Sequence, residues 1–563
     1  MKKLEFNKYL KYDEIKNLLE FWDEQYPDKA ILEVIGQSHE GRDVYAMTIT
    51  DLNVSEAEKK PAMYVDANIH AGEVTGSMAA LHLIDTLLTS KDEKVKRLLQ
   101  TRTFYILPRI NPDGAELYLT TPYTLRSSVR PFPNYRKDED PAGLHAEDVN
   151  NDGKILLMRV RDDQHGAWKI SPDDSRLMIK RKPYEFNGPF YHIYTEGVIK
   201  DEDGNIKEEV SYPYNPVKTK YGLDLNRNFP AGHDLHTPGS GPFPLSEPET
   251  RNQVEFINSK RNIGGVLLYH TTGGILFRPH STIPDKDFAK EDVELYNLIG
   301  GIGTEATGYK VECCYGDIWS GVLDDWCFEK KGLFAFTPEL WDAIGRAAPE
   351  LKKKSRDELT QKEKTEIELK LLEWNDRELA GKGFINWTEF THPQIGKVEI
   401  GGWDTKECRQ NPPVKFLEQE CYNMTQFALN YALSLPQVEI DETNVEKLSE
   451  DVYKIEVLVS NHGYLSTNIS KQAKKQNAAR KDRVKINLPD NILLKSGNYQ
   501  EEFDFLDGYN KGQNSRWYRF GDPAECAKRI SWTVQVMKDS NKKISIELIS
   551  ERGGHKSQEI HLS

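Results

Sequence analysis

The hydrophobic positions of the chain fall into short apolar runs and into segments with apolar residues at helical spacing. The apolar runs, which predict buried strands, cover residues 61–69, 103–108, 264–270 and 332–340. Helical spacing predicts helices over residues 10–27, 74–89 and 414–434. Residues 31–49 predict two more strands around a Gly-containing turn. Strands that are apolar on both faces and alternate with helices indicate an α/β fold, with a mixed, mostly parallel sheet and helices on both of its faces.

Two stretches interrupt this pattern, and a third ends it. Residues 134–220 are polar and predict a large insertion, and residues 349–380 are highly charged with leucines at helical spacing, which predicts an insertion of exposed helices. The pattern ends at residues 434–444. Beyond them the residues alternate between polar and apolar in runs at 452–460, 483–488, 529–536 and 543–550. The predicted organisation is an α/β domain over residues 1–436, followed by a small all-β, sandwich-like domain over residues 437–563.

Composition and charge narrow the classes of partner. The chain has 563 residues, 38% of them hydrophobic, and a net charge of −14. Nucleic acid and anionic membranes repel such a surface, so we expect neither as a partner. The N-terminus shows no signal-peptide core, and no stretch approaches the ~20 apolar residues that cross a bilayer. The sequence therefore predicts a cytoplasmic protein, or a secreted or periplasmic one if a leader was removed. The six cysteines form no C-x-x-C pair and are expected to be free thiols.

Two histidines and one glutamate lie at the ends of predicted strands, where open α/β sheets build their sites. His70 and Glu73 follow the run 61–69, and His270 ends the run 264–270. Each has an ordinary alternative, either a carboxylate at the positive end of a helix or a hydrogen-bonded histidine at the edge of the core. Together, two imidazoles and one carboxylate match a catalytic zinc site, which has three protein ligands and one open position.

Glu339 and a polar loop at residues 224–227 add further candidate chemistry. Glu339 follows the run 332–340, where a carboxylate at the rim of an apolar cleft can act as a general base. The alternative is a surface glutamate that ends a strand. An arginine beside an amide, as at Asn226 and Arg227, can bind a carboxylate, and Asp224 can orient a metal-bound histidine. The alternative there is a turn held by Asn and Asp side chains.

The sequence resembles the zinc metallocarboxypeptidase family typified by carboxypeptidase A. The motifs "NIHAGE", "RINPDG", "LDLNRNF", "LLYH" and "FTPEL" occur in the family's order, over roughly residues 9–435. The resemblance implies that His70, Glu73 and His270 bind one zinc ion. It also implies that Glu339 is the general base.

The same resemblance assigns roles to a second group of residues. Asn226 and Arg227 would bind the terminal carboxylate of the substrate, and Asp224 would be the hydrogen-bond partner of the first zinc-binding histidine. Arg126 would stabilise the oxyanion, with Arg130 as the competing candidate.

The sequence also departs from the family. Gly72 replaces the arginine that precedes the ligand glutamate in vertebrate digestive members, so one contact to the substrate carboxylate is missing. Thr271 and Thr272 replace Ser-Tyr after the third ligand. Tyr315 lies two residues from the position of the mobile substrate-binding tyrosine. Asp324 stands where members that prefer basic residues carry an acidic specificity residue; the alternative is a solvated loop carboxylate.

The resemblance predicts a zinc-dependent metallocarboxypeptidase that hydrolyses the C-terminal peptide bond of a peptide with a free carboxylate. One alternative is a zinc amidohydrolase of the same scaffold, acting on γ-glutamyl, acyl-amino-acid or cell-wall peptide amides. The other is a non-catalytic peptide-binding protein.

A separate signal lies in the polar insertion. Asp148, Asn150, Asp152 and Gly153 have the spacing of an EF-hand loop, which suggests Ca²⁺. The twelfth position is Arg159 and not the bidentate glutamate of that loop. We therefore favour a tight Asn-Asp-Gly turn, with Ca²⁺ as the alternative.

Overall fold

The centre of the molecule is an eight-stranded mixed sheet. A computed structural model describes residues 4–131, 142–217, 219, 221–316, 319–352, 358–513, 524–537 and 542–562. The strand order is β1-β2-β4-β3-β11-β14-β12-β13. These strands are β1 (Ala30–Gln37), β2 (Asp43–Ile49), β3 (Ala62–Ala67), β4 (Thr103–Leu107), β11 (Ile263–Thr271), β12 (Ile275–Arg278), β13 (Lys310–Cys313) and β14 (Phe334–Leu340). Each apolar run in the sequence is one of the buried central strands.

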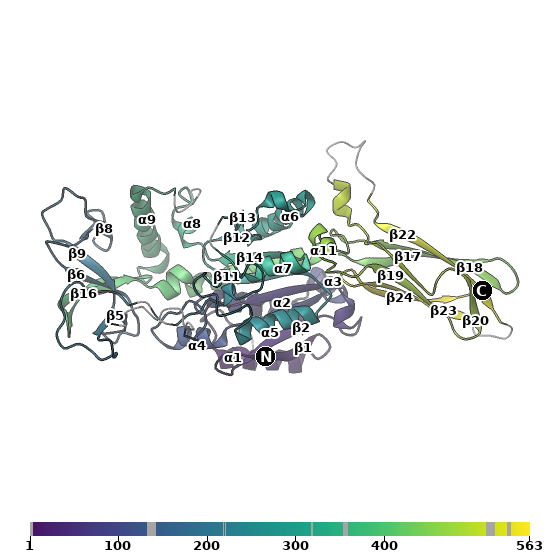
Figure 1. Ribbon diagram of the computed structural model, residues 1–563, viewed down its shortest axis with the longest axis horizontal. Helices are drawn as coiled ribbons and strands as arrows, with labels where there is room; N and C mark the ends of the chain where they lie inside the picture. The colour runs from purple at the N-terminus through teal and green to yellow at the C-terminus, as the bar shows by residue number, and fades with distance from the viewer. Residues whose placement is uncertain are drawn as a thin grey trace.

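Helices cover both faces of this sheet (Figure 1). One face packs against α1 (Tyr12–Gln25), α2 (Val74–Thr89), α3 (Glu93–Thr101), α6 (Lys290–Thr307) and α10 (Val414–Ser434). The other face packs against α5 (Pro248–Ser259) and α7 (Leu323–Lys331). The predicted fold class is confirmed, and the predicted helices 74–89 and 414–434 coincide with α2 and α10.

The central strands run in parallel. β3 pairs in parallel with β4 and with β11, and β11 pairs in parallel with β14. Their carboxyl ends therefore lie at one edge of the sheet. Polar side chains that follow these strands are brought together there, although the strands are far apart in the sequence.

The first insertion and residues 384–403, which follow the second insertion, build one lobe. Its six-stranded sheet has the order β15-β16-β6-β9-β7-β8, in which β16 pairs with β6. The strands are β6 (Leu157–Arg161), β7 (Trp168–Ile170), β8 (Met178–Lys180), β9 (Tyr191–Thr195), β15 (Phe384–His392) and β16 (Gly396–Trp403). The pair β5 (Gly143–Ala146) and β10 (Gly197–Lys200) lies beside it. Sequence analysis did not predict β15 and β16.

The charged segment within 349–380 forms α9 (Gln361–Leu379). This helix was expected to be exposed, but one side of it is buried. Ile367, Leu371 and Trp374 pack with Trp341, which follows β14. The second insertion is therefore joined to the central sheet by an apolar core of its own.

Beyond α10 the chain forms two four-stranded antiparallel sheets. One has the order β17-β18-β22-β20 and the other β21-β19-β23-β24. The strands are β17 (Val438–Lys447), β18 (Val452–Asn461), β19 (Asp482–Asn487), β20 (Ile492–Ser496), β21 (Gln500–Phe503), β22 (Ala527–Val536), β23 (Lys543–Ser550) and β24 (Gly554–His561). Alternate residues of both sheets enclose one apolar core, as in a sandwich.

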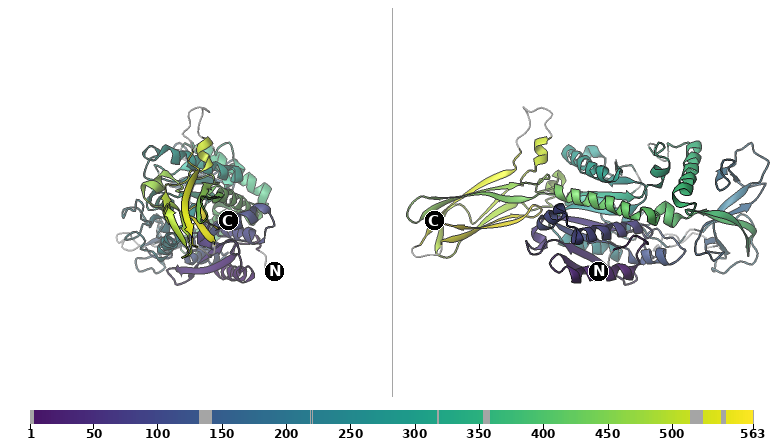
Figure 2. Two further views of the ribbon diagram at one scale, coloured as in Figure 1. Left: turned by 90° about the vertical axis from the view of Figure 1, so that its right-hand side faces the viewer. Right: turned by 180° about the vertical axis from the view of Figure 1, so that it is seen from behind.

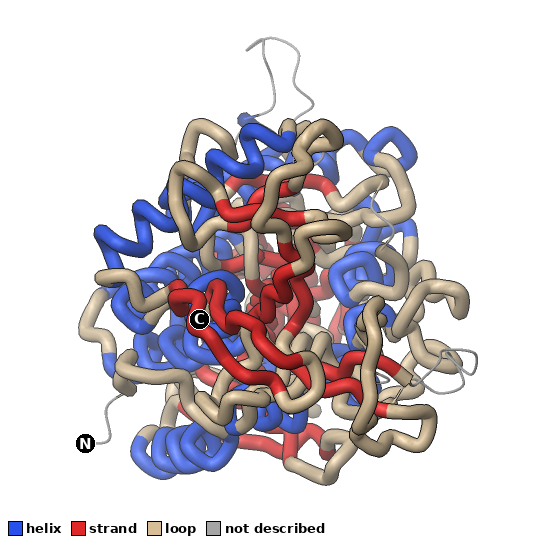
Figure 3. Tube along the Cα trace, turned by 90° about the vertical axis from the view of Figure 1, so that its left-hand side faces the viewer, coloured by secondary structure: helices blue, strands red, loops and turns tan. Residues whose placement is uncertain are grey.

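The sandwich and the lobe lie at opposite ends of the molecule (Figure 1; Figure 2, right). The sandwich meets the amino ends of the parallel strands, because Gly554 lies against Pro61 and Ile469 lies against Gly264. In the end-on view of Figure 3 the strands of the lobe stand in front of the central sheet. Within the described residues, no helix is long and apolar enough to cross a membrane.

Candidate metal centre and substrate cleft

The loop after β3 carries the first two candidate ligands. The chain turns at Asn68, which has a left-handed φ of 63°. The side chain of Asn68 donates a hydrogen bond to the His70 carbonyl at 2.7 Å. Glu73 then takes the N-cap position of α2. His270 is the last residue but one of β11, so the parallel pairing of β3 and β11 brings it to the same edge.

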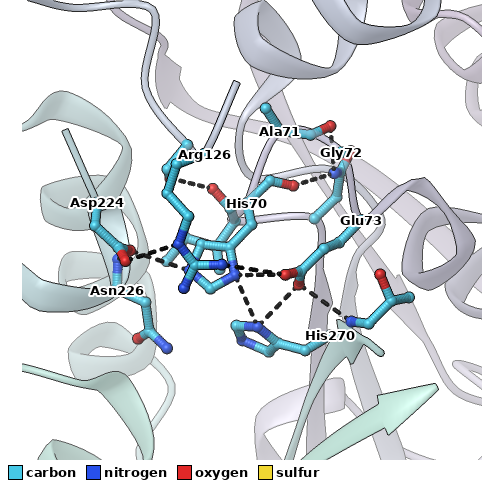
Figure 4. Close-up of polar contacts among 12 residues, drawn as sticks. His70, Ala71, Gly72, Glu73, Arg126, Asp224, Asn226 and His270 are labelled. Carbon is cyan, nitrogen blue, oxygen red and sulfur yellow. Dashed lines mark hydrogen bonds and ion pairs between the residues drawn. The ribbon is translucent and has the colours of Figure 1, made fainter. Parts of the chain in front are cut away.

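The side chains of His70, Glu73 and His270 converge (Figure 4). The His70 Nδ1 atom lies 2.8 Å from Glu73 Oε1 and 3.1 Å from His270 Nδ1. His270 Nδ1 lies 3.0 Å from Glu73 Oε2. All three residues are buried. The spatial convergence that the sequence predicted is therefore present in the structure.

The donor chemistry of this cluster fits a divalent ion. Ligand atoms of a tetrahedral zinc site with bonds of about 2.1 Å stand about 3.4 Å apart, a little wider than the spacing seen here. Without a bound cation, the lone pairs of two imidazole nitrogens and a carboxylate would repel one another in this buried site. Protons would then have to lie between them. Among the described residues, these three form the group whose geometry could hold a metal ion.

The outer nitrogen of His70 is fixed by a carboxylate. Its Nε2 atom lies 3.0 Å from Asp224 Oδ1, so Nδ1 faces the cluster. Arg126 donates from Nε to Asp224 Oδ2 at 3.0 Å, and its Nη1 atom lies 3.6 Å from Glu73 Oε1. Burial and Arg126 lower the pKa of His70, but Glu73 and Asp224 outweigh them and the pKa is raised. A carboxylate behind a metal-ligating histidine is a common way to orient the ring.

Glu73 is held in the cluster from several sides. The Thr271 backbone N–H donates to its Oε2 atom at 3.2 Å. Burial alone would raise the pKa of Glu73, but His70 and His270 lower it well below its usual range. The two imidazoles therefore favour the ionised form of Glu73, the form that can act as an anionic ligand.

Glu339 lies beside the cluster. It pairs in register with His270 across the parallel strands β14 and β11, so the two side chains leave the sheet on the same side. Burial, and then the negative charge of Glu73, raise the pKa of Glu339 to about 8, while His270 and Arg126 oppose the shift. The surroundings thus make Glu339 bind a proton more strongly than an exposed glutamate does.

The structure distinguishes the two arginine candidates. Arg126 contacts both Asp224 and Glu73, and about half of its side chain is exposed. Arg130 instead forms an ion pair with the buried Glu247. Arg126 is therefore the arginine that faces the cluster.

Asn226 and Arg227 lie in the short helix η2 (Leu225–Arg227). The Asn226 Oδ1 atom accepts a hydrogen bond from the Leu323 N–H at 3.1 Å, which orients the side-chain amide. Arg227 is mostly buried, and its nearest carboxylate oxygen is that of Asp224 at 4.0 Å. Burial lowers the pKa of Arg227, so an anionic ligand would relieve a desolvated charge.

Asp324 lies in the first turn of α7 and is buried, which excludes a solvated loop carboxylate. Its Oδ2 atom accepts from Thr337 Oγ1 at 3.2 Å, and Oδ1 accepts from the Asp325 N–H at 3.1 Å. Burial raises the pKa of Asp324, although the charge of His270 opposes the shift. A cation beside this carboxyl would stabilise its ionised form.

Tyr315 follows β13 and is 53% exposed. Within the described residues, no hydrogen bond or ring contact joins its side chain to the cluster. Its role stays a prediction.

The missing arginine at position 72 has a steric explanation. A Cβ atom at Gly72 would lie 2.6 Å from the side chain of Gln410 and 2.7 Å from the ring of Tyr118. Gln410 is the last residue of η4 (Thr405–Gln410), which packs over the loop. The space beside the glutamate ligand is therefore filled by a different part of the chain.

Three fully buried asparagines that sequence analysis missed hold the loop between β3 and α2. They are Asn68, Asn111 and Asn411. Asn111 donates to the Ile69 carbonyl at 3.2 Å and to the Ser127 carbonyl at 2.8 Å. Asn111 lies in the "RINPDG" motif, so the motif itself could have found it, whereas Asn411 lies in no motif.

The Asp-Asn-Asp loop of the insertion forms a turn. The carboxylate of Asp148 accepts from the backbone N–H groups of Asp152 at 3.2 Å and Gly153 at 2.8 Å. Asn150 Oδ1 also accepts from the Asp152 N–H, at 2.9 Å. These oxygens are satisfied by the backbone, which agrees with the favoured interpretation of a turn; Ca²⁺ stays untested.

Comparison with known proteins agrees with this geometry. A family model described as zinc carboxypeptidase matches residues 15–154 and 188–359, more than half of the chain. A second model, described only as a domain of unknown function, matches residues 437–561.

Curated relatives match over shorter stretches. Zinc carboxypeptidase A 1 of Drosophila melanogaster is 35% identical over 98 residues, 17% of this chain and 23% of that protein. Carboxypeptidase B of Astacus astacus is 32% identical over 111 residues, 20% of this chain and 35% of that protein. The chain thus spans well under half the length of these relatives.

A crystal structure of thrombin activatable fibrinolysis inhibitor matches 76% of this chain and 74% of its own, at 17% identity and a TM-score of 0.44. The family rests on the zinc carboxypeptidase model, which spans the loop of His70 and Glu73 as well as His270 and Glu339. This chain belongs to the zinc carboxypeptidase family.

Proposed function

We propose that this chain is a zinc-dependent metallocarboxypeptidase that hydrolyses the C-terminal peptide bond of peptides. The observation that carries the proposal is the convergence of His70, Glu73 and His270 at one edge of the sheet. Glu339 lies beside them in register with His270. Family membership supports the same chemistry.

His70, Glu73 and His270 would hold the zinc ion. Zinc bound there would act as a Lewis acid on the scissile carbonyl and lower the pKa of a bound water toward ~7. Asp224 keeps Nε2 of His70 occupied, so that Nδ1 stays directed at the site.

Glu339 would move the proton. In this scheme its carboxylate accepts a proton from the attacking water and delivers it to the leaving amine. Its position beside His270 on the neighbouring strand supports this role. One group thus serves as base in the first step and as acid in the second.

Arg126 would stabilise the negative charge on the carbonyl oxygen. It lies 3.6 Å from Glu73 and is held through its Nε atom by Asp224, which leaves donors at the other end of the guanidinium. One such donor typically contributes a few kcal/mol to transition-state stabilisation.

Asn226 and Arg227 would bind the free carboxylate of the substrate. Arg227 is mostly buried and its nearest carboxylate is 4.0 Å away, so it can accept an anionic partner. Asp324 would favour a Lys or Arg side chain through charge pairing, because it is a buried carboxyl. Tyr315 is our candidate for the aromatic residue that covers the substrate; its support is its exposed ring and its place in the sequence.

A zinc amidohydrolase of the same scaffold remains the second candidate. The observation that favours it is Gly72, since the missing arginine leaves fewer groups to select a terminal carboxylate.

The metal centre predicts zinc binding by the purified protein. We expect about one zinc ion per chain after dialysis, and less than about a tenth of that in His270→Ala, because the site loses one of three ligands. Elemental analysis measures both. His462→Ala is the matched control, since His462 is exposed and contacts only Asp441 among the described carboxylates. A folded, metal-free wild type would favour the non-catalytic binding protein.

The general base predicts a large loss of turnover in Glu339→Gln. We expect kcat on blocked dipeptides to fall about 10²- to 10⁴-fold, with zinc content retained, because the amide cannot accept the proton. Glu312→Gln is the control, since Glu312 is exposed on the edge strand β13. Near-wild-type turnover in Glu339→Gln would remove this residue from the scheme.

The carboxylate site predicts a preference for free acids. Wild type should cleave peptides with a free C-terminal carboxylate much faster than the corresponding C-terminal amides. In Arg227→Met, kcat/KM for the peptides with a free carboxylate should fall about 10- to 100-fold, which corresponds to the free energy of one charged hydrogen bond. Exposed Arg251→Met serves as the control. Equal cleavage of acids and amides by wild type would support the amidohydrolase instead.

The buried acid predicts a specificity change in Asp324→Asn. We expect kcat/KM for peptides ending in Lys or Arg to fall at least about tenfold, which corresponds to the lower end of the free energy of a charged hydrogen bond. For peptides ending in Leu we expect little change. Asp325→Asn is the comparison, because Asp325 accepts from the Ser281 N–H and should affect both substrates alike. A wild type without preference for basic residues would disprove the role of Asp324.

A further inference from the structure

Asn411 contacts the metal-binding loop from outside the family's motifs. It follows the helical turn η4 (Thr405–Gln410), which comes after the second insertion and the strands β15 and β16. The zinc carboxypeptidase model ends at residue 359, so this contact comes from a segment that the model does not include. Asn411 is fully buried, and its side chain lies against the loop that contains Glu73.

The side chain of Asn411 holds the backbone on both sides of Glu73. Its Oδ1 atom accepts from the Thr75 N–H at 3.1 Å and from Thr75 Oγ1 at 2.8 Å. Its Nδ2 atom donates to the Gly72 carbonyl at 2.8 Å and to the Lys406 carbonyl at 3.1 Å. The amide thus joins the residue before Glu73 to the helix that follows it.

The start of α2 explains why this contact is needed. Glu73 is the N-cap residue of α2, and Thr75 occupies the second helical position. An N-cap side chain normally accepts from the N–H of the second or third helical residue. The Glu73 side chain makes no such bond, because its carboxylate points to His70 and His270. The orphan N–H of Thr75 must therefore find another acceptor.

We propose that Asn411 is a positioning residue for the metal centre. It replaces Glu73 as the cap of α2, so that the Glu73 carboxylate remains available to the metal. Its bond to the Gly72 carbonyl fixes the direction in which the chain enters Glu73. The inference rests on the proposed metal site and goes beyond it, because it makes a segment outside the zinc carboxypeptidase model part of that site.

The surrounding contacts make this cap rigid. The Tyr118 hydroxyl donates to Gln410 Oε1 at 3.1 Å and lies 3.2 Å from Asn411 Nδ2. The side chain of Lys406 donates to the carbonyls of Tyr118 and Thr121 at 2.7 Å each. Asn411 is thereby held between α4 (Pro112–Thr120) and the metal-binding loop.

The direct test measures zinc affinity in Asn411→Ala. We expect the dissociation constant for zinc to rise about 10- to 100-fold, the range typical of groups that orient metal ligands. Competition with a chromophoric chelator measures it. The absorption spectrum of the cobalt-substituted protein should change as well, since the Glu73 ligand is displaced. Wild-type affinity and an unchanged cobalt spectrum in a folded variant would overturn the inference.

A second variant covers a failure to fold. Asn411→Asp keeps the acceptor for the Thr75 N–H and loses the donor to the Gly72 carbonyl. We expect its zinc affinity to lie between those of wild type and the alanine variant, and the melting temperature of the metal-free protein to fall, because a buried carboxylate oxygen would face the Gly72 and Lys406 carbonyls. Wild-type affinity in Asn411→Asp, where the alanine variant does not fold, would equally overturn the inference.

Asn375 provides the matched control. It is also fully buried and lies in α9, and its Oδ1 atom accepts from the Gly383 N–H at 2.7 Å, away from the metal-binding loop. Asn375→Ala should lower the melting temperature and leave zinc affinity unchanged. Equal loss of affinity in both variants would show a general structural effect. Absence of zinc binding in wild type would instead disprove the proposed function itself.

Discussion

The parallel pairing of β3, β11 and β14 is the constraint on which the rest of the structure depends. Because these strands run the same way, their carboxyl ends share one edge, and His70, His270 and Glu339 meet there from three distant parts of the chain. The pairing also sets which side each residue faces, since His270 and Glu339 are partners in register. A shift by one residue would turn one of them away from the cleft.

A buried carboxylate between two imidazoles is costly unless a positive charge is shared among them. Much of the local structure offsets that cost. Thr271 donates to Glu73, Asp224 fixes His70, and the helix start that Glu73 does not cap is capped by Asn411. The backbone of the metal-binding loop is thus hydrogen-bonded by remote side chains such as Asn411, which leaves His70 and Glu73 free to face the cluster.

Sequence analysis predicted the central sheet and the metal centre because both follow from local patterns. Apolar runs mark buried strands, and a polar residue at the end of such a run must lie at the sheet edge. The lobe was harder to predict. β16 pairs with β6 across more than two hundred residues, and most of β15 is partly exposed, so no local pattern identifies the partner. Asn411 was missed for a related reason, since its role arises only where the segment after η4 folds back onto Gly72 and Thr75.

The central claim is that two nitrogen donors and one oxygen donor from this chain bind a single zinc ion. X-ray absorption at the zinc edge tests it most directly on the zinc-loaded protein. The account predicts a first shell of nitrogen and oxygen atoms at about 2.0–2.2 Å, with a signal from two imidazoles that falls to one in His270→Ala. A sulfur-containing shell, or a two-imidazole signal that survives in His270→Ala, would contradict it.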